Sequence, residues 1–262
     1  GAYSKVPMPI LGQMQLVADG SVTRYAYAAA NQIRNLFTDV SGVTGTGAST
    51  TLTKMSGSTS GTSLLRIPES PTTAPSNAAA LATYVLGKFN STGQTVLKDF
   101  PVDIKLKLLN FLGYNTGGAT ILPTALTTPN SPYLSMGGSI HSLPVQLTYS
   151  GTLDASGNLT NARDQSILYG SMEGGLHLVD ASTGDEQMVF VPADILNDAT
   201  ASKALIVGAS ATGEVPKHGL DGTWVADPTY NITSTTSGTT TTTKVTARQM
   251  NIYGGMRMGG SS

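Results

Sequence analysis

The stretch SILYGSMEGGLHLVDASTGDEQMVFVP, from Ser166 to Pro192, decides the fold class. It holds three short apolar runs, SILYG, GLHLV and QMVFV, which are separated by the turn clusters SMEG and DASTG. Apolar runs of about five residues bounded by Gly, Asp and Ser are typical of β-strands joined by tight turns. The stretch therefore predicts three consecutive strands, and Pro192 closes the third.

The β pattern continues on both sides of this stretch. Further strands and turns are predicted at Ser139–Tyr149, the turn Asp154–Asn158, Lys203–Gly208, Gly222–Ala226, a hairpin over Asn231–Thr246 turning at Ser237-Gly238, and Met250–Gly254. Several short strands with a turn signal about every ten residues indicate a β-sandwich or a β-propeller.

The first half of the chain has a different pattern. Apolar residues at helical spacing predict helices over Arg24–Phe37, Asn77–Phe89 and Asp103–Leu112. Gly113 follows the third helix and suits a helix stop. The Gly-, Ser- and Thr-rich stretch Ser41–Ser63 predicts a mobile loop. We therefore expect a mainly β chain with a helical, loop-rich lead-in.

Composition excludes several kinds of site and partner. The 262 residues include no cysteine, which rules out disulfides, zinc–thiolate sites, iron–sulfur clusters and cysteine nucleophiles. Charged residues make up 12% of the chain and the net charge is −1, so no general field attracts nucleic acid. No apolar run reaches the ~20 residues that a membrane-spanning helix needs.

Two passages carry a family resemblance. Ser166–Pro192 resembles the blade repeat of quinoprotein-like propellers, "vyvGtndGmLHaFda-tGeElfayvP", and its Leu-His and Val-Pro pairs resemble the C-terminal propeller of PilY-type pilus proteins. Met136–Val145 (MGGSIHSLPV) resembles that family's "lGDilHSsPvvv", with Gly138 where the family commonly has Asp. Two looser matches are GLDGTWVAD at 219–227 and IYGGMRMGG at 252–260.

The resemblance implies a division and a fold. Residues 136–262 would form the first blades of a β-propeller, and residues 1–135 the lead-in. Because a propeller has 4–8 blades, the chain would be part of a larger protein. The family-motif residues are Gly138, His141, Gly175, His177, Asp180, Gly184, Asp221 and Asp227. We expect structural histidines and turn-capping aspartates among them, rather than catalytic groups.

The function that the resemblance implies is not enzymatic. A PilY-type protein acts at the tip of type IV pili on the bacterial surface, where it serves pilus assembly with minor pilins and adhesion to host or abiotic surfaces. No cofactor is evident in this segment. The family's calcium loop has Asp-x-Asp-x-Asp-Gly character, so it would lie beyond Ser262. Asp154–Asn158 lacks the glycine and the distal acid of an EF-hand and is interpreted as a polar turn.

Two alternatives remain at this stage. Quinone-dependent dehydrogenases use the same blade repeat, but they generally carry a Trp-rich repeat and often a vicinal cysteine pair, whereas this chain has one Trp and no Cys. A periplasmic propeller scaffold is the other alternative. Its chain would close the propeller within a short protein and would not need a long lead-in.

Overall fold

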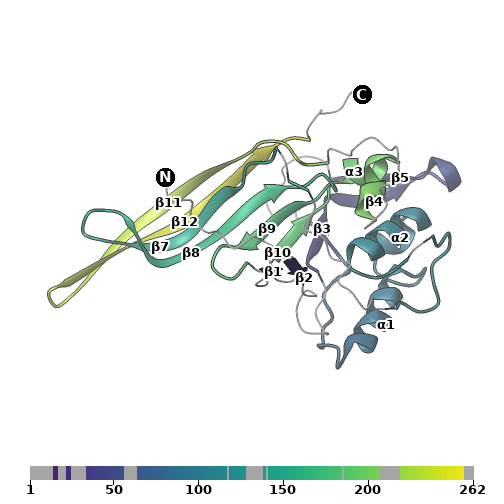
Figure 1. The fold of residues 1–262 in the computed structure, drawn as a ribbon, viewed down its shortest axis with the longest axis horizontal. Coiled ribbons are helices and arrows are strands. Elements are labelled where there is room, and N and C mark those ends of the chain that lie inside the picture. The colour runs from purple at the N-terminus through teal and green to yellow at the C-terminus, as the bar shows by residue number, and fades with distance from the viewer. Residues whose placement is uncertain are drawn as a thin grey trace.

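The computed structural model describes residues 14–16, 22–24, 34–55, 64–116, 118–127, 138–139, 141–184, 186–206 and 219–256. The chain is mainly β, as predicted, and most of its strands belong to one mixed eight-stranded sheet (Figure 1). In spatial order the strands are β11 (Trp224–Ser237), β12 (Thr240–Gly254), β7 (Val145–Leu153), β8 (Leu159–Gly170), β9 (Leu176–Asp180), β10 (Glu186–Phe190), β3 (Leu36–Thr38) and β6 (Leu65–Ile67).

The sheet is open. All neighbouring strands are antiparallel except β10 and β3, which run parallel. Strands β11 and β6 form the two outer edges, and no pairing among the described residues closes them into a ring. Two small antiparallel pairs lie outside this sheet: β1 (Met14–Leu16) with β2 (Val22–Arg24), and β4 (Val40–Thr44) with β5 (Thr51–Lys54).

Strands β7 to β10 form an antiparallel meander that confirms the three strands predicted within Ser166–Pro192. The run SILYG is the inner end of the twelve-residue β8, because β8 already begins at Leu159. The predicted strand at 139–149 starts later than expected, at Val145. Gly184 ends the predicted turn after β9 with a φ of 80°, a conformation that glycine adopts without a steric cost.

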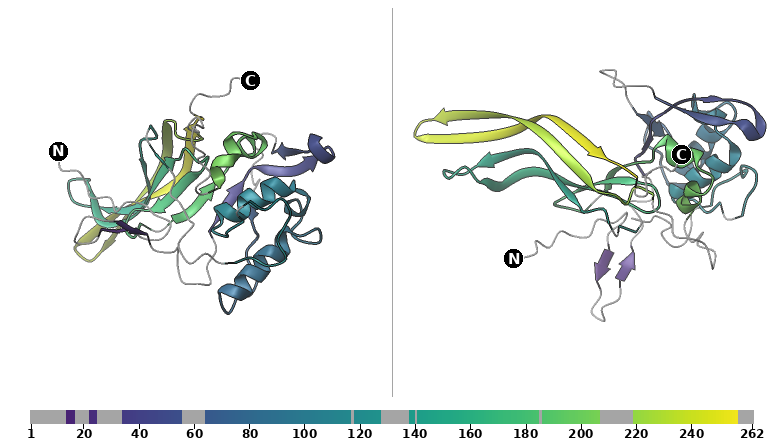
Figure 2. Two further views of the ribbon diagram at one scale, coloured as in Figure 1. Left: turned by 45° about the vertical axis from the view of Figure 1, so that its right-hand side comes forward. Right: turned by 90° about the horizontal axis from the view of Figure 1, so that it is seen from above.

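The β11–β12 hairpin confirms the predicted turn at Ser237-Gly238 and is much longer than expected. Its strands have 14 and 15 residues, and Gly238 has a φ of 62° in the first position of the two-residue turn. The predicted strand Met250–Gly254 is the far end of β12 rather than a new strand. Figure 2 shows this hairpin and the β7–β8 hairpin extending together away from the helices.

Two helices of the lead-in form as predicted. Helix α1 (Ala78–Phe89) begins after Asn77, whose side chain accepts a hydrogen bond from the Ala80 amide and so caps the helix. Helix α2 (Val102–Phe111) is followed by Gly113, which has a φ of 102°. No helix within the described residues is long and apolar enough to cross a membrane.

Three predictions for the secondary structure are wrong. The helix expected over Arg24–Phe37 is contradicted at both ends, where β2 and β3 are strands; residues 25–33 lie outside the described residues. The loop expected at Ser41–Ser63 contains β4, a 3₁₀ helix at Gly47–Ser49 and β5; residues 56–63 are not described. The strand expected at Lys203–Gly208 falls on a 3₁₀ helix, Ala201–Leu205, and 207–208 are not described.

Packing explains the first of these errors. Leu36 is fully buried between β10 on one side and β6 on the other, so its place in the sheet outweighs the helical spacing of the sequence around it. The main core lies between this end of the sheet, the helices α1 and α2, and the short helix α3 (Ala193–Asn197). It includes residues from both sides of position 135, and the division into 1–135 and 136–262 stays a prediction.

The contact between Gly170, at the end of β8, and Leu220, before β11, gives a direct test of how closely these two segments approach each other. A Cβ added at Gly170 would lie 1.8 Å from the Leu220 carbonyl oxygen, which is backbone and cannot rotate away. Gly170→Ala should therefore lower the free energy of unfolding by about 3 kcal/mol or more. Gly87→Ala in α1 meets nothing within 4 Å and should raise it, by up to about 1 kcal/mol. Chemical denaturation of both variants measures the difference, and equal stabilities would contradict the close approach.

Candidate functional site

Most of the family-motif residues meet where the segment before β7, the β8–β9 turn and the segment before β11 come together. The structure brings Gly138, His141, Gly175, His177 and Asp221 to this junction, and it places Asp180, Gly184 and Asp227 elsewhere. The junction holds two polar clusters, one around Asp221 and one around Glu186. Each joins parts of the chain that are far apart in sequence.

Asp221 organises the first cluster. Its side chain is fully buried, and its Oδ1 accepts hydrogen bonds from the amides of His141 at 2.9 Å and Ser142 at 2.8 Å. Its Oδ2 lies 3.0 Å from Nδ1 of His141, whose own side chain is 45% exposed. The carboxylate therefore fixes the segment before β7 to the segment before β11. The amides that Asp221 caps lie 80 and 79 residues away in the sequence, and the capping of its own turn stays a prediction.

The backbone around this contact is bonded as well. The Ser142 hydroxyl oxygen accepts a hydrogen bond from the Gly170 amide at 2.8 Å, and Ser142 is buried. The Ser142 hydroxyl therefore has a structural role, and its buried position does not suit a nucleophile that His141 would activate. The Gly138 amide donates hydrogen bonds to both carboxylate oxygens of Glu173, at 3.0 and 2.8 Å. Gly138 is the position at which the quoted pilus-family pattern commonly has an aspartate. Burial raises the pKa of Glu173.

Glu186, at the start of β10, organises the second cluster. Arg34 donates to its two carboxylate oxygens at 2.9 and 3.1 Å, and Nδ1 of His177 lies 2.8 Å from Oε2. All three side chains are almost completely buried. Nε2 of His177 lies 3.2 Å from the Ser171 hydroxyl, and the ring stacks on Tyr169 with centroids 4.8 Å apart. His177 is thus a bonded core histidine, as predicted.

Arg34 extends the second cluster to the helices. Its guanidinium donates to the carbonyl oxygen of Phe111, at the end of α2, at 2.9 Å. The same group lies 3.9 Å from the centre of the Phe111 ring, a cation–π contact. One buried cation therefore connects the meander, through Glu186, to the end of α2.

The charges of this cluster follow from burial and pairing. Burial lowers the pKa of His177 below its usual 6.5, against the opposing effect of Glu186. Burial alone would raise the pKa of Glu186, but the charge of Arg34 and the hydrogen bond with His177 outweigh it, so the pKa lies below its ordinary value. At neutral pH the cluster therefore contains an ionised Glu186–Arg34 pair and a neutral His177.

The remaining motif residues have local roles. The Asp180 Oδ1 accepts hydrogen bonds from the amides of Ser182 and Thr183 and from the Ser182 hydroxyl, and the bond from that hydroxyl is the largest cause of its lowered pKa. A Cβ on Gly175 would lie 2.7 Å from Nε2 of His177, so only glycine fits beside the ring. Asp227 is an exposed residue within β11, and the turn-capping role expected for it is wrong.

The second cluster contains two residues whose roles the sequence did not predict. Glu186 was part of the blade match, but nothing in a single sequence pairs it with Arg34, 152 residues away. Arg34 fell within the helix that was wrongly expected. The interpretation of Asp154 as a polar turn is confirmed, since its Oδ1 accepts from the Ser156 and Asn158 amides. Within the described residues, no group of three or more His, Asp and Glu is arranged to hold a metal ion.

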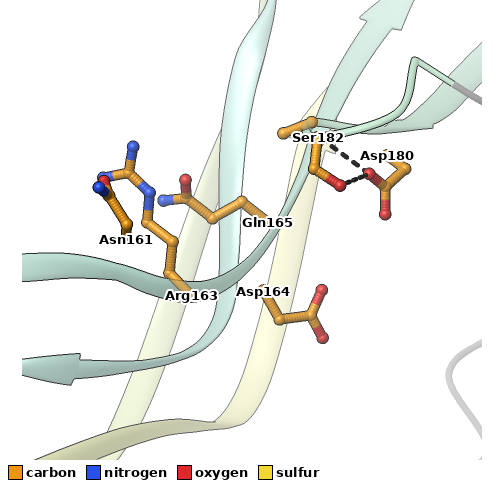
Figure 3. Close-up of a pocket in the computed structure, with 7 residues that line it drawn as sticks. Asn161, Arg163, Asp164, Gln165, Asp180 and Ser182 are labelled. Atoms are coloured by element: carbon orange, nitrogen blue, oxygen red, sulfur yellow. Dashed lines mark hydrogen bonds between the residues drawn. The ribbon is translucent and has the colours of Figure 1, made fainter.

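A separate hollow of about 260 Å³ lies beside β8, where β9 ends and β8 continues (Figure 3). Its lining is polar and consists of Asn161, Arg163, Asp164, Gln165, Asp180, Ala181 and Ser182. Arg163 and Asn161 lie close together in the view, while Asp164 points to the other side of β8. The hollow shares only Asp180 with the family-motif residues, and that carboxylate is already bonded within its own turn.

The His177 environment predicts acid sensitivity. The pKa of His177 is lower in the folded chain than its usual 6.5, so below about pH 6.5 the unfolded chain binds a proton that the folded chain does not. The free energy of unfolding should therefore fall as the pH drops from 6.5 to 5, by at most about 1.4 kcal/mol per pH unit from this group. The lowered pKa of Glu186 acts in the same direction at still lower pH.

Chemical denaturation at a series of pH values measures this slope. His177→Gln carries no titrating group at this position and provides the matched control. The variant should lose the part of the slope that lies between pH 6.5 and 5. An unchanged slope would show that His177 is not the group responsible.

The buried ion pair predicts a strong dependence on Arg34. Arg34→Met leaves the Glu186 carboxylate buried without its cation, which should cost about 3–5 kcal/mol of unfolding free energy. The double variant Arg34→Met with Glu186→Leu removes the stranded charge and should recover part of the loss. Thermal and urea denaturation of the two variants check this order, and a single variant as stable as the unaltered chain would disprove the role of the pair.

Comparisons with protein-family models, with curated proteins and with solved structures found no match to this chain. Both clusters hold distant segments in fixed positions. The bonds of Asp221 join the segments that lead into the β7–β8 and β11–β12 hairpins.

Proposed function

We propose that this chain is a non-enzymatic, surface-exposed segment of a PilY-type protein, which acts at the tip of type IV pili in assembly with minor pilins and in adhesion. In this proposal the chain is exported through the periplasm to the bacterial surface. Its mechanism is the display of contact surface on a rigid base. No bond-making step is needed.

The meander supports the family part of this proposal. A propeller blade is a four-stranded antiparallel sheet, and β7, β8, β9 and β10 form an antiparallel meander of four strands in chain order. In this chain the meander is continued by β12 beside β7 and by β3 beside β10. The motif residues His177 and Gly175 lie within it, and Asp221 ties its first strand to the next hairpin. In the proposal this unit is the first blade, and further blades would come from the rest of the protein.

The projecting β11–β12 hairpin supports the adhesion part of the proposal. From Tyr230 to Ser237 every residue of β11 is exposed, and Lys244 is the only charged residue between Tyr230 and Ala247. Most of the other side chains carry hydroxyl groups, among them the cross-strand pairs Ser234–Thr243 at 2.9 Å and Thr236–Thr241 at 3.0 Å, while Ile232 is an apolar side chain that is 65% exposed. A long arm that is rich in hydroxyl groups and carries a single charge suits contact with glycans or hydrated surfaces better than it suits recognition of a charged partner.

Shortening the arm in the full-length protein tests this function. Replacing Ser234–Thr243 by Gly-Asn leaves the Thr233–Lys244 pair to close the hairpin, so the sheet below should fold unchanged. We expect attachment of the bacteria to host cells and abiotic surfaces to fall several-fold, while the protein still co-purifies with sheared pili on an immunoblot. A strain lacking the major pilin should lose that signal.

The matched control shortens the β4–β5 connection at Gly47–Ser49, which lies at the helical end of the molecule. This variant should attach normally. Full attachment by the shortened β11–β12 arm would remove the adhesive role of the hairpin. Confinement of the protein to the soluble periplasm in both strains would overturn the pilus assignment as a whole.

A further inference from the structure

No strand in the described part of the chain pairs with the outer edge of β11, and the distal half of that edge lacks the features that protect sheet edges. Between Tyr230 and Ser237 it carries no charge and no proline, and all of these residues are exposed. The proximal half differs, because it holds Asp227, Pro228 and a register shift between Thr229 and Tyr230. Charges, prolines and bulges are the devices by which sheet edges avoid pairing with other chains. The distal half has none of them.

The hairpin geometry shows which backbone groups this edge offers. Ser237 and Thr240 flank the two-residue turn and form a hydrogen-bonded pair, so hydrogen-bonded and non-hydrogen-bonded pairs alternate from there down the hairpin. The side-chain contacts Ser234–Thr243 and Thr236–Thr241 fall in the non-hydrogen-bonded pairs, where side chains are closer. The amides and carbonyls that point away from β12 therefore belong to Tyr230, Ile232, Ser234 and Thr236.

We propose that this edge pairs with the same edge of a second copy of the chain, antiparallel, about a two-fold axis at Thr233. In that register Tyr230 faces Thr236 of the other copy, and Ile232 faces its Ser234. All four outward-pointing residues then meet outward-pointing residues, and the pairs exchange about eight hydrogen bonds. The inference does not depend on the proposed pilus function.

Several observations favour a second copy as the occupant. The edge is self-complementary in its hydrogen-bonding positions, and two identical uncharged segments meet without repulsion. Shifting the axis to Ile232 would bring Pro228, which has no amide hydrogen, opposite Thr236. Shifting it to Ser234 would leave Tyr230 unpaired. The axis at Thr233 is thus the one that uses all four free positions.

The side chains also gain from this pairing. Ile232 is 65% exposed and Tyr230 is 40% exposed in the single chain. Pairing brings Ser234 and Thr236 of the second copy alongside them. The contact is a single pair of short strands, which is small for a stable interface, so we expect a reversible dimer that depends on concentration.

A cysteine scan tests the register, because the chain has no cysteine of its own. Thr233 would face Thr233 of the second copy in a non-hydrogen-bonded pair with Cα atoms about 4.5 Å apart, within the range of a disulfide. Thr233→Cys should therefore form a disulfide-linked dimer readily under mild oxidation. Thr235→Cys lies about 13 Å from its own copy and should not.

Mixing Thr235→Cys with Asn231→Cys provides the positive control, since these two positions face each other in the proposed register. Their mixture should cross-link although neither variant does so alone. Equal cross-linking of Thr233→Cys and Thr235→Cys would overturn the register.

Sedimentation velocity tests the pairing itself on the unmodified chain. Ser234→Pro removes an amide hydrogen that points away from β12, so the hairpin should persist while the dimer is lost. Ser234→Ala removes the hydroxyl but keeps the amide, and it should dimerise as the unaltered chain does. A chain that stays monomeric at millimolar concentration, or a Ser234→Pro variant that dimerises normally, would overturn the proposal.

Discussion

The buried contact of Arg34 with Glu186 is the constraint on which the arrangement of the sheet depends. Arg34 stands two residues before β3, and Glu186 is the first residue of β10. Once this pair forms, the following residues of the two segments lie side by side and run in the same direction. Leu36 then pairs with Val189, and the Val189 amide donates to the carbonyl oxygen of Asn35 at 2.9 Å. The anchor thus lies beside the one parallel pair of the described sheet and holds its two segments together.

The same anchor explains why the two ends of the molecule differ. A buried ion pair is costly to desolvate, so it persists where further hydrogen bonds satisfy both groups. Phe111 and His177 supply those bonds, and with them come α2 on one side and the β8–β9 turn on the other. The apolar core gathers around this end. None of the helices in the described part of the chain covers the distal β11–β12 hairpin, and its residues from Tyr230 to Ser237 are exposed.

Local patterns predicted local structure well. Asn77, Gly113, Asp180 and the Ser237-Gly238 turn each satisfy or redirect the backbone within a few residues, so a single sequence contains the whole reason for them. Leu36 shows the opposite case, because its strand is fixed by β10 and β6, which lie far away in the sequence. Arg34 and Glu186 were missed for the same reason, and the lengths of β8, β11 and β12 exceed what their apolar residues indicate.

The two proposals for the β11–β12 hairpin use different groups of the same arm. Edge pairing uses the outward backbone groups of Tyr230 to Thr236, which lie in the plane of the sheet. Surface contact uses side chains that stand above and below that plane, such as Thr233 and Thr235 on one face and Thr243 on the other, because neighbouring residues of a strand point to opposite faces. Joining two arms edge to edge would therefore double the hydroxyl-bearing area without covering it. Weak contacts gain most from such doubling, since a second contact on one rigid body forms at high effective concentration.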